Sequence, residues 1–178
     1  MDPPDRLEGE GVALRPLRAD DALAHAAAFR DDPDLGRVLG FPTDPDEEWV
    51  RARVAGAAER DGFELAVTTG GSDALEGVVI VHHVEPDHGR AELGFWVLHD
   101  VRGRGLGARA VALVVDWLFA EAGLRRIELR TSPDNRGAQA LAQRLGFTHE
   151  GVMRRRDVER GVAVDVVWFG LLREEWRR

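Results

Sequence analysis

Three alternate glycines stand in the stretch Val101-Arg102-Gly103-Arg104-Gly105-Leu106-Gly107-Ala108-Arg109. The apolar run at 91–98 before it predicts a strand, and the apolar positions of 106–119 after it recur with the period of a helix. Glycines let the backbone turn sharply and approach a ligand closely. The free N–H groups at the start of a helix bind anions. The stretch therefore predicts a phosphate-binding loop between a strand and a helix.

Three phosphate-binding patterns compete for this loop, beside a plain flexible connection of glycine and arginine. The P-loop requires Gly-Lys-Ser or Gly-Lys-Thr, which the stretch lacks. The dinucleotide fingerprint is matched by Gly103, Gly105 and Ala108, with Glu128 about twenty residues further on. That fingerprint should follow the first strand of its domain, however, and here several strand candidates come earlier. The third pattern, Gln/Arg-x-x-Gly-x-Gly/Ala, begins at Arg102.

On this third pattern the chain resembles the GCN5-related N-acetyltransferase (GNAT) family. Residues 135–147, from Asn135 to Leu-Gly-Phe, resemble the second cofactor segment of that family. Residues 12–22 and 150–154 resemble the RimJ/RimL-like branch, which acetylates the N-termini of ribosomal proteins. The resemblance covers nearly the whole chain in the right order. It implies one N-acetyltransferase domain over residues 1–178.

The fold class expected is α+β: a mixed, mostly antiparallel central sheet with helices on both faces and a parallel βαβ unit around the glycine loop. Residues 1–9 are expected to form a flexible tail, and residues 34–42 a loop. Hydrophobic periodicity and turn signals predict strands at 12–17, 63–68, 75–84, 90–98, 127–131, 147–156 and 162–172. They predict helices at 21–30, 45–59, 106–119 and from 135 onward.

Composition limits the partners. The 178 residues, 44% of them hydrophobic, suffice for one sizeable core. The net charge, 24 − 32 = −8, repels nucleic acid and attracts cationic amines. With no cysteine the chain has no disulfide and no thiolate metal site. The sequence shows neither a signal peptide nor an apolar run of membrane-spanning length, so we expect a cytoplasmic protein without a membrane partner.

The resemblance implies acetyl-CoA as the acetyl donor and assigns residues to it. The backbone of 96–98 would pair with the pantetheine arm, with one N–H near Val97 directed at the thioester carbonyl. The loop N–H groups would hold the pyrophosphate, helped by the two arginine charges. The implied cofactor residues are Trp96, Val97, Leu98, Arg102, Gly103, Arg104, Gly105, Leu106, Gly107, Ala108 and Asn135.

Glu92 is the predicted general base. It lies four residues before Trp96, hence on the same face of the strand, at a position where several branches of the family carry a catalytic glutamate. The alternative is a solvent-facing or paired carboxylate. His82 and His83 are adjacent and are expected to point to opposite faces, so that one of them could reach the acceptor cleft. The histidine spacing does not suggest a metal site.

The chain lacks the side chains that usually protonate the leaving coenzyme A thiolate in this family. It contains no tyrosine, and Ala138 stands where the ribosomal branch has a serine. Without cysteine, direct attack in a ternary complex is the remaining route.

The expected activity is acetylation of a primary amine, by resemblance a protein N-terminal α-amine. The alternatives are an aminoglycoside or polyamine acetyltransferase and a non-catalytic acyl-CoA-binding module. The segment 168–176 either covers the domain's own core or pairs across a homodimer.

Overall fold

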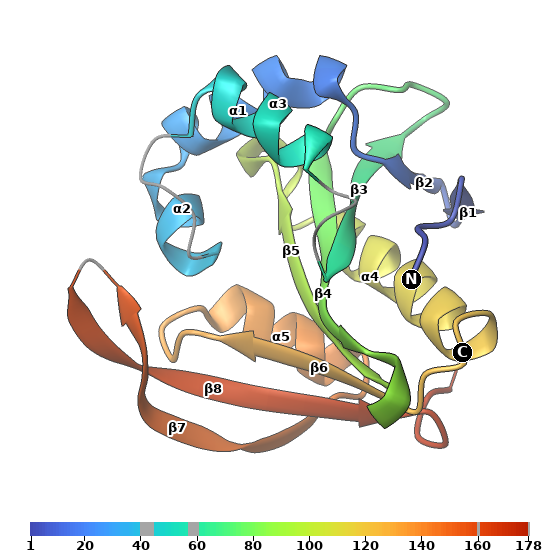
Figure 1. The fold of residues 1–178 in the computed structure, drawn as a ribbon, viewed down its shortest axis with the longest axis vertical. Coiled ribbons are helices and arrows are strands. Elements are labelled where there is room, and N and C mark those ends of the chain that lie inside the picture. Colours follow the sequence, from blue (N-terminus) through green and yellow to red (C-terminus); the bar gives the residue numbers. More distant parts are fainter. Residues whose placement is uncertain (40–44, 57–60, 160, 178) are drawn as a thin grey trace.

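The computed structural model describes residues 1–39, 45–56, 61–159 and 161–177. Within these ranges, eight strands form one sheet in the order β1-β2-β3-β4-β5-β6-β8-β7 (Figure 1). Neighbouring strands are antiparallel except for β5 and β6, which are parallel. The strands are β1 Leu7–Gly9, β2 Val12–Pro16, β3 Gly62–Thr69, β4 Gly77–Glu85, β5 Arg90–Val97, β6 Arg126–Thr131, β7 Thr148–Glu159 and β8 Val162–Leu172. The predicted α+β class with one parallel pair is confirmed.

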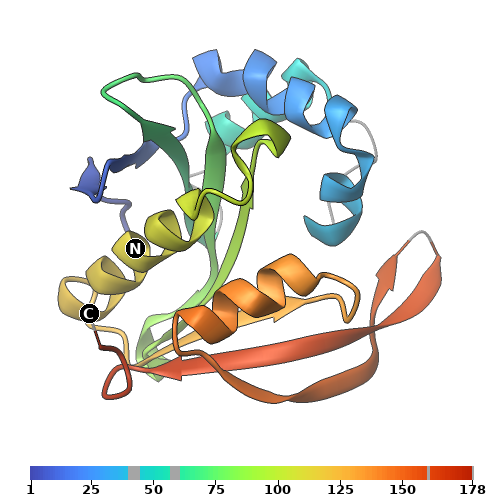
Figure 2. The same ribbon diagram turned by 180° about the vertical axis from the view of Figure 1, so that it is seen from behind.

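Helices cover both faces of the sheet. Helices α4 (Leu106–Ala120) and α5 (Arg136–Arg144) lie across one face, which Figure 2 shows from the front. Helices α1 (Ala22–Asp31), α2 (Pro33–Leu39) and α3 (Glu47–Ala55) gather at the other side, over one end of β4 and β5 (Figure 1). No helix in the described ranges is both long and apolar enough to span a bilayer.

The alternation of side chains along β5 builds two apolar layers. Leu93 belongs to the larger core, together with Val111 and Val114 of α4. Trp96, three residues on, belongs to a smaller core on the opposite face with Phe29 of α1. Because successive side chains of a strand point to opposite faces, one strand anchors helices on both sides. β5 is therefore buried on both faces, as a central strand must be.

The first expectation that the structure corrects is the tail. Leu7–Gly9 forms strand β1 and pairs with residues 12–14 of β2. Glu10 and Gly11 both have positive φ angles, 52° and 75°, which allows the tight turn between the two strands. Leu7 packs against the larger core, and this contact fixes a segment that looks featureless in the sequence.

The loop expected at 34–42 is also wrong in its described part, because residues 33–39 form helix α2. A proline after a helical run ends that helix, but proline also fits the first turn of the next one, as Pro33 does here. The helix expected at 45–59 is shorter: α3 runs from Glu47 to Ala55, and the side chain of its cap, Asp46, accepts a hydrogen bond from the N–H of Trp49. Residues 40–42 and 57–59 lie outside the described ranges.

His25 of α1 is a polar group inside the smaller core. Its ring stacks on Phe29 with 5.1 Å between centroids and meets Trp96 edge-on at 5.0 Å. Neither ring nitrogen has a hydrogen-bond partner among the described residues. Burial, with a smaller contribution from the charge of Arg53, lowers the pKa of His25 to about 4. The imidazole is therefore neutral in the folded protein at neutral pH.

This burial predicts a loss of stability in acid. The unfolded chain binds a proton at this histidine below about pH 6.5, whereas the folded chain does so only near pH 4, so stability falls as the pH drops between these values. At pH 5 the loss amounts to roughly 2 kcal/mol relative to pH 7. His25→Leu should remove this part of the pH dependence, measured by urea unfolding at both pH values. Equal pH dependence in the variant and the wild type would contradict the assignment.

Candidate active site

The two parallel strands separate beside the glycine loop. β5 and β6 pair from Arg90↔Arg126 to Leu93↔Leu129, after which no register links them although both strands continue. Both views show β5 diverging from β6 (Figures 1 and 2). A cleft of about 630 Å³ lies at this separation, bounded by the end of β5, the glycine loop and the start of α5.

Most of the predicted cofactor residues line this cleft. They are Trp96, Val97, Arg102, Gly103, Gly105, Leu106, Gly107, Ala108 and Asn135. Leu98 and Arg104 are not among the lining residues. The cleft is also lined by Phe95 and Leu141, two apolar residues that the motif did not point to.

Only some backbone groups of β5 face the gap. The N–H of Leu98 donates to the carbonyl oxygen of Glu76 on the β4 side at 2.8 Å. Because backbone groups alternate along a strand, those of Trp96 also face β4, and those of Phe95 and Val97 face the gap. Phe95 and Val97 are therefore the residues that can pair with an extended ligand there. This corrects the prediction for Trp96 and Leu98, because the sequence does not reveal the phase of the alternation.

The glycine loop forms the expected start of a helix. Gly103 and Gly105 have φ angles of 75° and 74°, and Gly105 is the cap residue of α4. The N–H groups of the residues that follow the cap have no carbonyl partner within the helix. At Gly107 a Cβ atom would lie 3.4 Å from Leu141 and 3.7 Å from Phe95, so α4 packs in ordinary contact with both residues here.

Arg102 is engaged within the protein. Its Nε donates to the carbonyl oxygen of Val97 at 3.1 Å, and its guanidinium forms an ion pair of 2.6 Å with Asp32 at the end of α1. The contact with Asp32, which sequence reasoning missed, ties the glycine loop to the helices on the other side. At α5 the side-chain oxygen of Asn135 caps the helix by accepting from the N–H of Ala138 at 3.1 Å.

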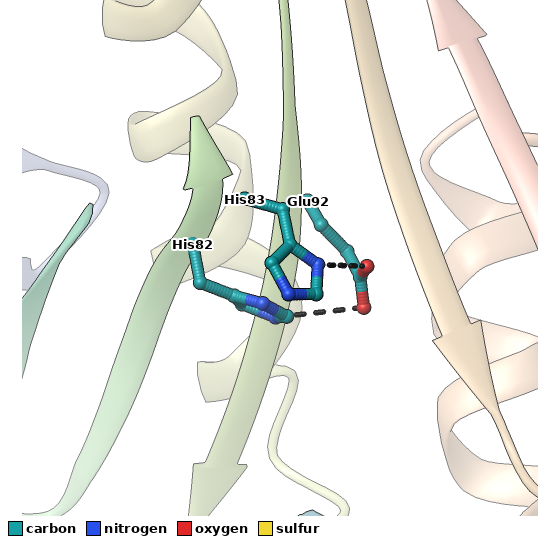
Figure 3. A group of neighbouring side chains, drawn as sticks. All are labelled: His82, His83 and Glu92. Atoms are coloured by element: carbon teal, nitrogen blue, oxygen red, sulfur yellow. Dashed lines mark hydrogen bonds and ion pairs between the residues drawn. The ribbon is translucent and has the colours of Figure 1, made fainter. Parts of the chain in front are cut away.

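Glu92 lies at the point where β5 and β6 separate, and its side chain is only 4% exposed. Its Oε1 accepts from Nε of Arg130 at 2.6 Å. Nδ1 of His83 lies 3.1 Å from Oε2, and Nε2 of His82 lies 3.5 Å from Oε1 (Figure 3). Arg130 in turn donates to Asp157 of β7 at 2.9 Å. The carboxylate is paired rather than solvent-facing.

The expectation that His82 and His83 point to opposite faces is wrong. The register of β4 with β5 shifts between His82 and Glu85, and His83 has a φ of 46°, so both rings turn toward Glu92 (Figure 3). Burial is the main cause that lowers the pKa of His82, which is opposed by the charge of Glu92. His82 is therefore held in its neutral form.

The three side chains also resemble a set of metal ligands. Donor atoms of His82, His83 and Glu92 lie within 4.8 Å of one another, a cluster that histidine spacing in the sequence did not suggest. Arg130 already places a positive charge 2.6 Å from the carboxylate. Because like charges repel, this arginine opposes a second cation at the same oxygen.

A second cavity of about 590 Å³ begins at this cluster. His83 and Glu92 line it together with Glu85, Glu128 and Glu150. Arginines 90, 126 and 156 line it as well, so its wall is strongly charged but mixed in sign. Glu92 thus borders an open, polar cavity on the face of the sheet opposite α4.

Sequence reasoning missed Arg130 and Asp157, the partners of Glu92. One signal was present: residues 126–130 alternate charged and apolar side chains, which predicts one polar face of that strand. The pairing itself depends on the register between β5 and β6 and on the distant strand β7. The residues in these two contacts are 38 and 27 positions apart in the chain, so no local sequence signal indicates them.

Comparison with known proteins agrees with this arrangement. Residues 12–148 match the family model described as acetyltransferase (GNAT) domain, and the chain belongs to this family. It is therefore an N-acetyltransferase of the GNAT type, an enzyme rather than a non-catalytic binding module. The chain is 26% identical to the putative ribosomal N-acetyltransferase YdaF of Bacillus subtilis, with 94% of each chain covered. The predicted family and the RimJ/RimL-like branch are confirmed.

Solved structures share the fold. A probable GNAT-family acetyltransferase from Chromobacterium violaceum is 29% identical, with a TM-score of 0.87 over 98% of this chain and 89% of that one. Mycobacterium smegmatis RimJ, solved in complex with a CoA-disulfide, is 23% identical, with a TM-score of 0.83 over 94% of this chain and 84% of that one.

Proposed function

We propose that this enzyme transfers an acetyl group from acetyl-CoA to the N-terminal α-amine of a protein. The observation that carries the proposal is the cleft of about 630 Å³ where β5 leaves β6 beside the start of α4. It offers the backbone groups of Phe95 and the N–H of Val97 along one wall and helix N–H groups at one end. A pantetheine arm and a pyrophosphate need these two kinds of partner.

Each part of the cleft has a defined task. The N–H groups of Leu106, Gly107 and Ala108, with the positive end of the α4 dipole, bind the pyrophosphate. The backbone of Phe95 pairs with the extended arm, and the N–H of Val97 polarises the thioester carbonyl. Acetyl-CoA supplies an activated acetyl group, so the protein only has to orient it and manage one proton.

The reaction is a direct transfer. The amine lone pair attacks the carbonyl carbon, a C–N bond forms, the C–S bond breaks, and the electron pair leaves on sulfur. The attacking amine must lose a proton, and the network around Glu92 is the group of titratable side chains at the end of the parallel pairing. The chain has no cysteine to carry the acetyl group, which agrees with direct attack.

Two features support a protein N-terminus as the acceptor. The chain is similar over nearly its whole length to a protein named putative ribosomal N-acetyltransferase. The cavity next to Glu92 is open and lined by both signs of charge, which suits a polypeptide end with its amine and flanking carbonyls. The carboxylates Glu85, Glu128 and Glu150 in the same wall favour a small cationic amine as the second candidate.

The test is release of free coenzyme A thiol from acetyl-CoA. Because the protein has no cysteine, a thiol reagent reports only the product. Acceptors are peptides with a free N-terminus, the same peptides with a blocked N-terminus and a lysine, polyamines and aminoglycosides. We expect turnover with the free N-termini alone. Turnover confined to polyamines or aminoglycosides would replace the protein acceptor by the small cationic amine.

A further inference from the structure

The geometry points to His83 as the base that accepts the amine proton, with Glu92 as the residue that positions its imidazole. This inference rests on the proposed function and names a group that carries out its proton transfer. It replaces the prediction that Glu92 itself is the base.

The two candidate bases, Glu92 and His83, differ in how far they are buried. The side chain of Glu92 is 4% exposed, and both of its oxygens have protein partners, Arg130 on one and His83 on the other. An amine could reach this carboxylate only after the ion pair opened. The side chain of His83 is 62% exposed and lines the open cavity of about 590 Å³. Among the described side chains in contact with Glu92, His83 is the most exposed, and it lines this cavity.

The hydrogen bond fixes which nitrogen can act. A carboxylate accepts hydrogen bonds, so Oε2 of Glu92 favours the tautomer in which Nδ1 of His83 carries the hydrogen. Nε2 then keeps its lone pair. Carboxylate-held histidines act as bases by this arrangement in enzymes with unrelated folds.

The backbone at His83 is unusual in a way that serves this contact. A φ of 46° at a residue other than glycine is sparsely populated and costs of order 1 kcal/mol or more. In a regular strand His83 would point to the face opposite His82, away from Glu92. The irregularity in β4 after His82 turns the ring onto the carboxylate. Strained residues of this kind cluster at functional sites.

Charged groups from several strands surround the contact between His83 and Glu92. The facing groups are His82 on the same strand, Glu92 on β5, Arg130 on β6, Asp157 on β7, and more distantly Glu85 and Arg53. Arg130 lies between the carboxylates of Glu92 and Asp157. Burial keeps His82 neutral by lowering its pKa. Among the described residues, the acidic group in contact with the His83 ring is the carboxylate of Glu92.

In this mechanism, His83 also provides the acid that protonates the leaving thiolate. The amine proton passes to Nε2 of His83 as the C–N bond forms. The imidazolium then gives that proton to the leaving sulfur, directly or through a water molecule, as the C–S bond breaks. One group thus serves as base and acid, in a chain that has no tyrosine and has Ala138 where the ribosomal branch carries serine.

The experiment compares His83→Ala and His83→Gln with the control His88→Ala. His88 is also exposed, at 72%, but its carboxylate neighbour is Glu85 at 3.9 Å, outside the Glu92 network. We expect kcat of both His83 variants to fall about 100-fold, the acidic limb of the pH–rate profile to lose one ionisation, and the Kd for acetyl-CoA to stay the same. Added imidazole should restore part of the turnover of His83→Ala and leave the control unchanged.

Outcomes that overturn the inference are distinct from failure of the proposed function. Wild-type enzyme that acetylates amines while His83→Ala stays within threefold of it would refute the role of His83. So would wild-type activity that a chelator abolishes and Zn²⁺ restores, which would make the three side chains metal ligands. A readout without turnover is the ¹⁵N spectrum of the imidazole: hydrogen on Nε2 rather than on Nδ1 of His83 would refute the inference even if no acceptor reacted.

Discussion

Glu92→Gln should lower kcat about 100-fold, as much as the loss of His83 itself, while the Kd for acetyl-CoA stays within about twofold. The amide can still accept a hydrogen bond from Arg130 through its oxygen. Its NH₂ group then faces His83, where it donates to Nδ1 instead of accepting from it. The imidazole is driven into the tautomer whose Nε2 carries hydrogen and cannot take a proton. The cleft proposed for acetyl-CoA is lined by other residues, so donor binding should survive.

The matched control is Glu128→Gln. Glu128 sits opposite Glu92 in the parallel register and lines the same charged cavity, but its partner is Arg126. We expect its kcat to stay within about threefold of the wild type, measured by thiol release with acetyl-CoA and the acceptor both saturating, so that a change in acceptor binding does not enter. If both variants lost activity equally, the charge of the cavity and not the contact with His83 would explain the effect.

Gly77→Ala should destabilise the protein by about 3 kcal/mol and weaken acetyl-CoA binding about tenfold. Gly77 of β4 pairs with Val97 of β5. A Cβ atom here would lie 2.4 Å from the carbonyl oxygen of Trp96 and 3.0 Å from Cα of Val97. The clash is with backbone, which cannot rotate away, so β5 must shift at the residues that face the acetyl-CoA cleft.

Gly56→Ala is the control for this prediction. Gly56 caps α3 with a φ of −84°, which alanine adopts without strain, and its Cβ would lie 3.4 Å from the nearest atom. We expect stability within about 0.5 kcal/mol of the wild type, from urea unfolding, and an unchanged Kd by calorimetry. Unaltered acetyl-CoA affinity in Gly77→Ala would show that the end of β5 does not contribute to the donor site.

Much of the fold follows from local sequence. The period-two runs and turn residues predict strands β2 to β8 within a few residues, and the helical run after Gly105 predicts α4. A helical crossover requires β5 and β6 to be parallel. Asn135 stands directly before α5 and caps it, as an asparagine at that place should. These signals are readable because each depends on neighbours within one element.

The errors arose where local signals were ambiguous. The segment 7–9 is too short to show periodicity, and its pairing depends on the contact of Leu7 with the core. Pro33 ends one helix and opens another, two roles that proline fills equally well in a sequence.

The sequence by itself determined the family, the glycine loop that opens a helix and the candidate carboxylate Glu92. Only the tertiary structure decided which side chains contact that carboxylate. The irregularity at His83 places two adjacent histidines on one face, and the β5/β6 register brings Arg130 to Glu92. Burial then separates a paired carboxylate from an exposed imidazole. These features depend on strand register and on contacts between distant segments, which no local pattern of residues specifies.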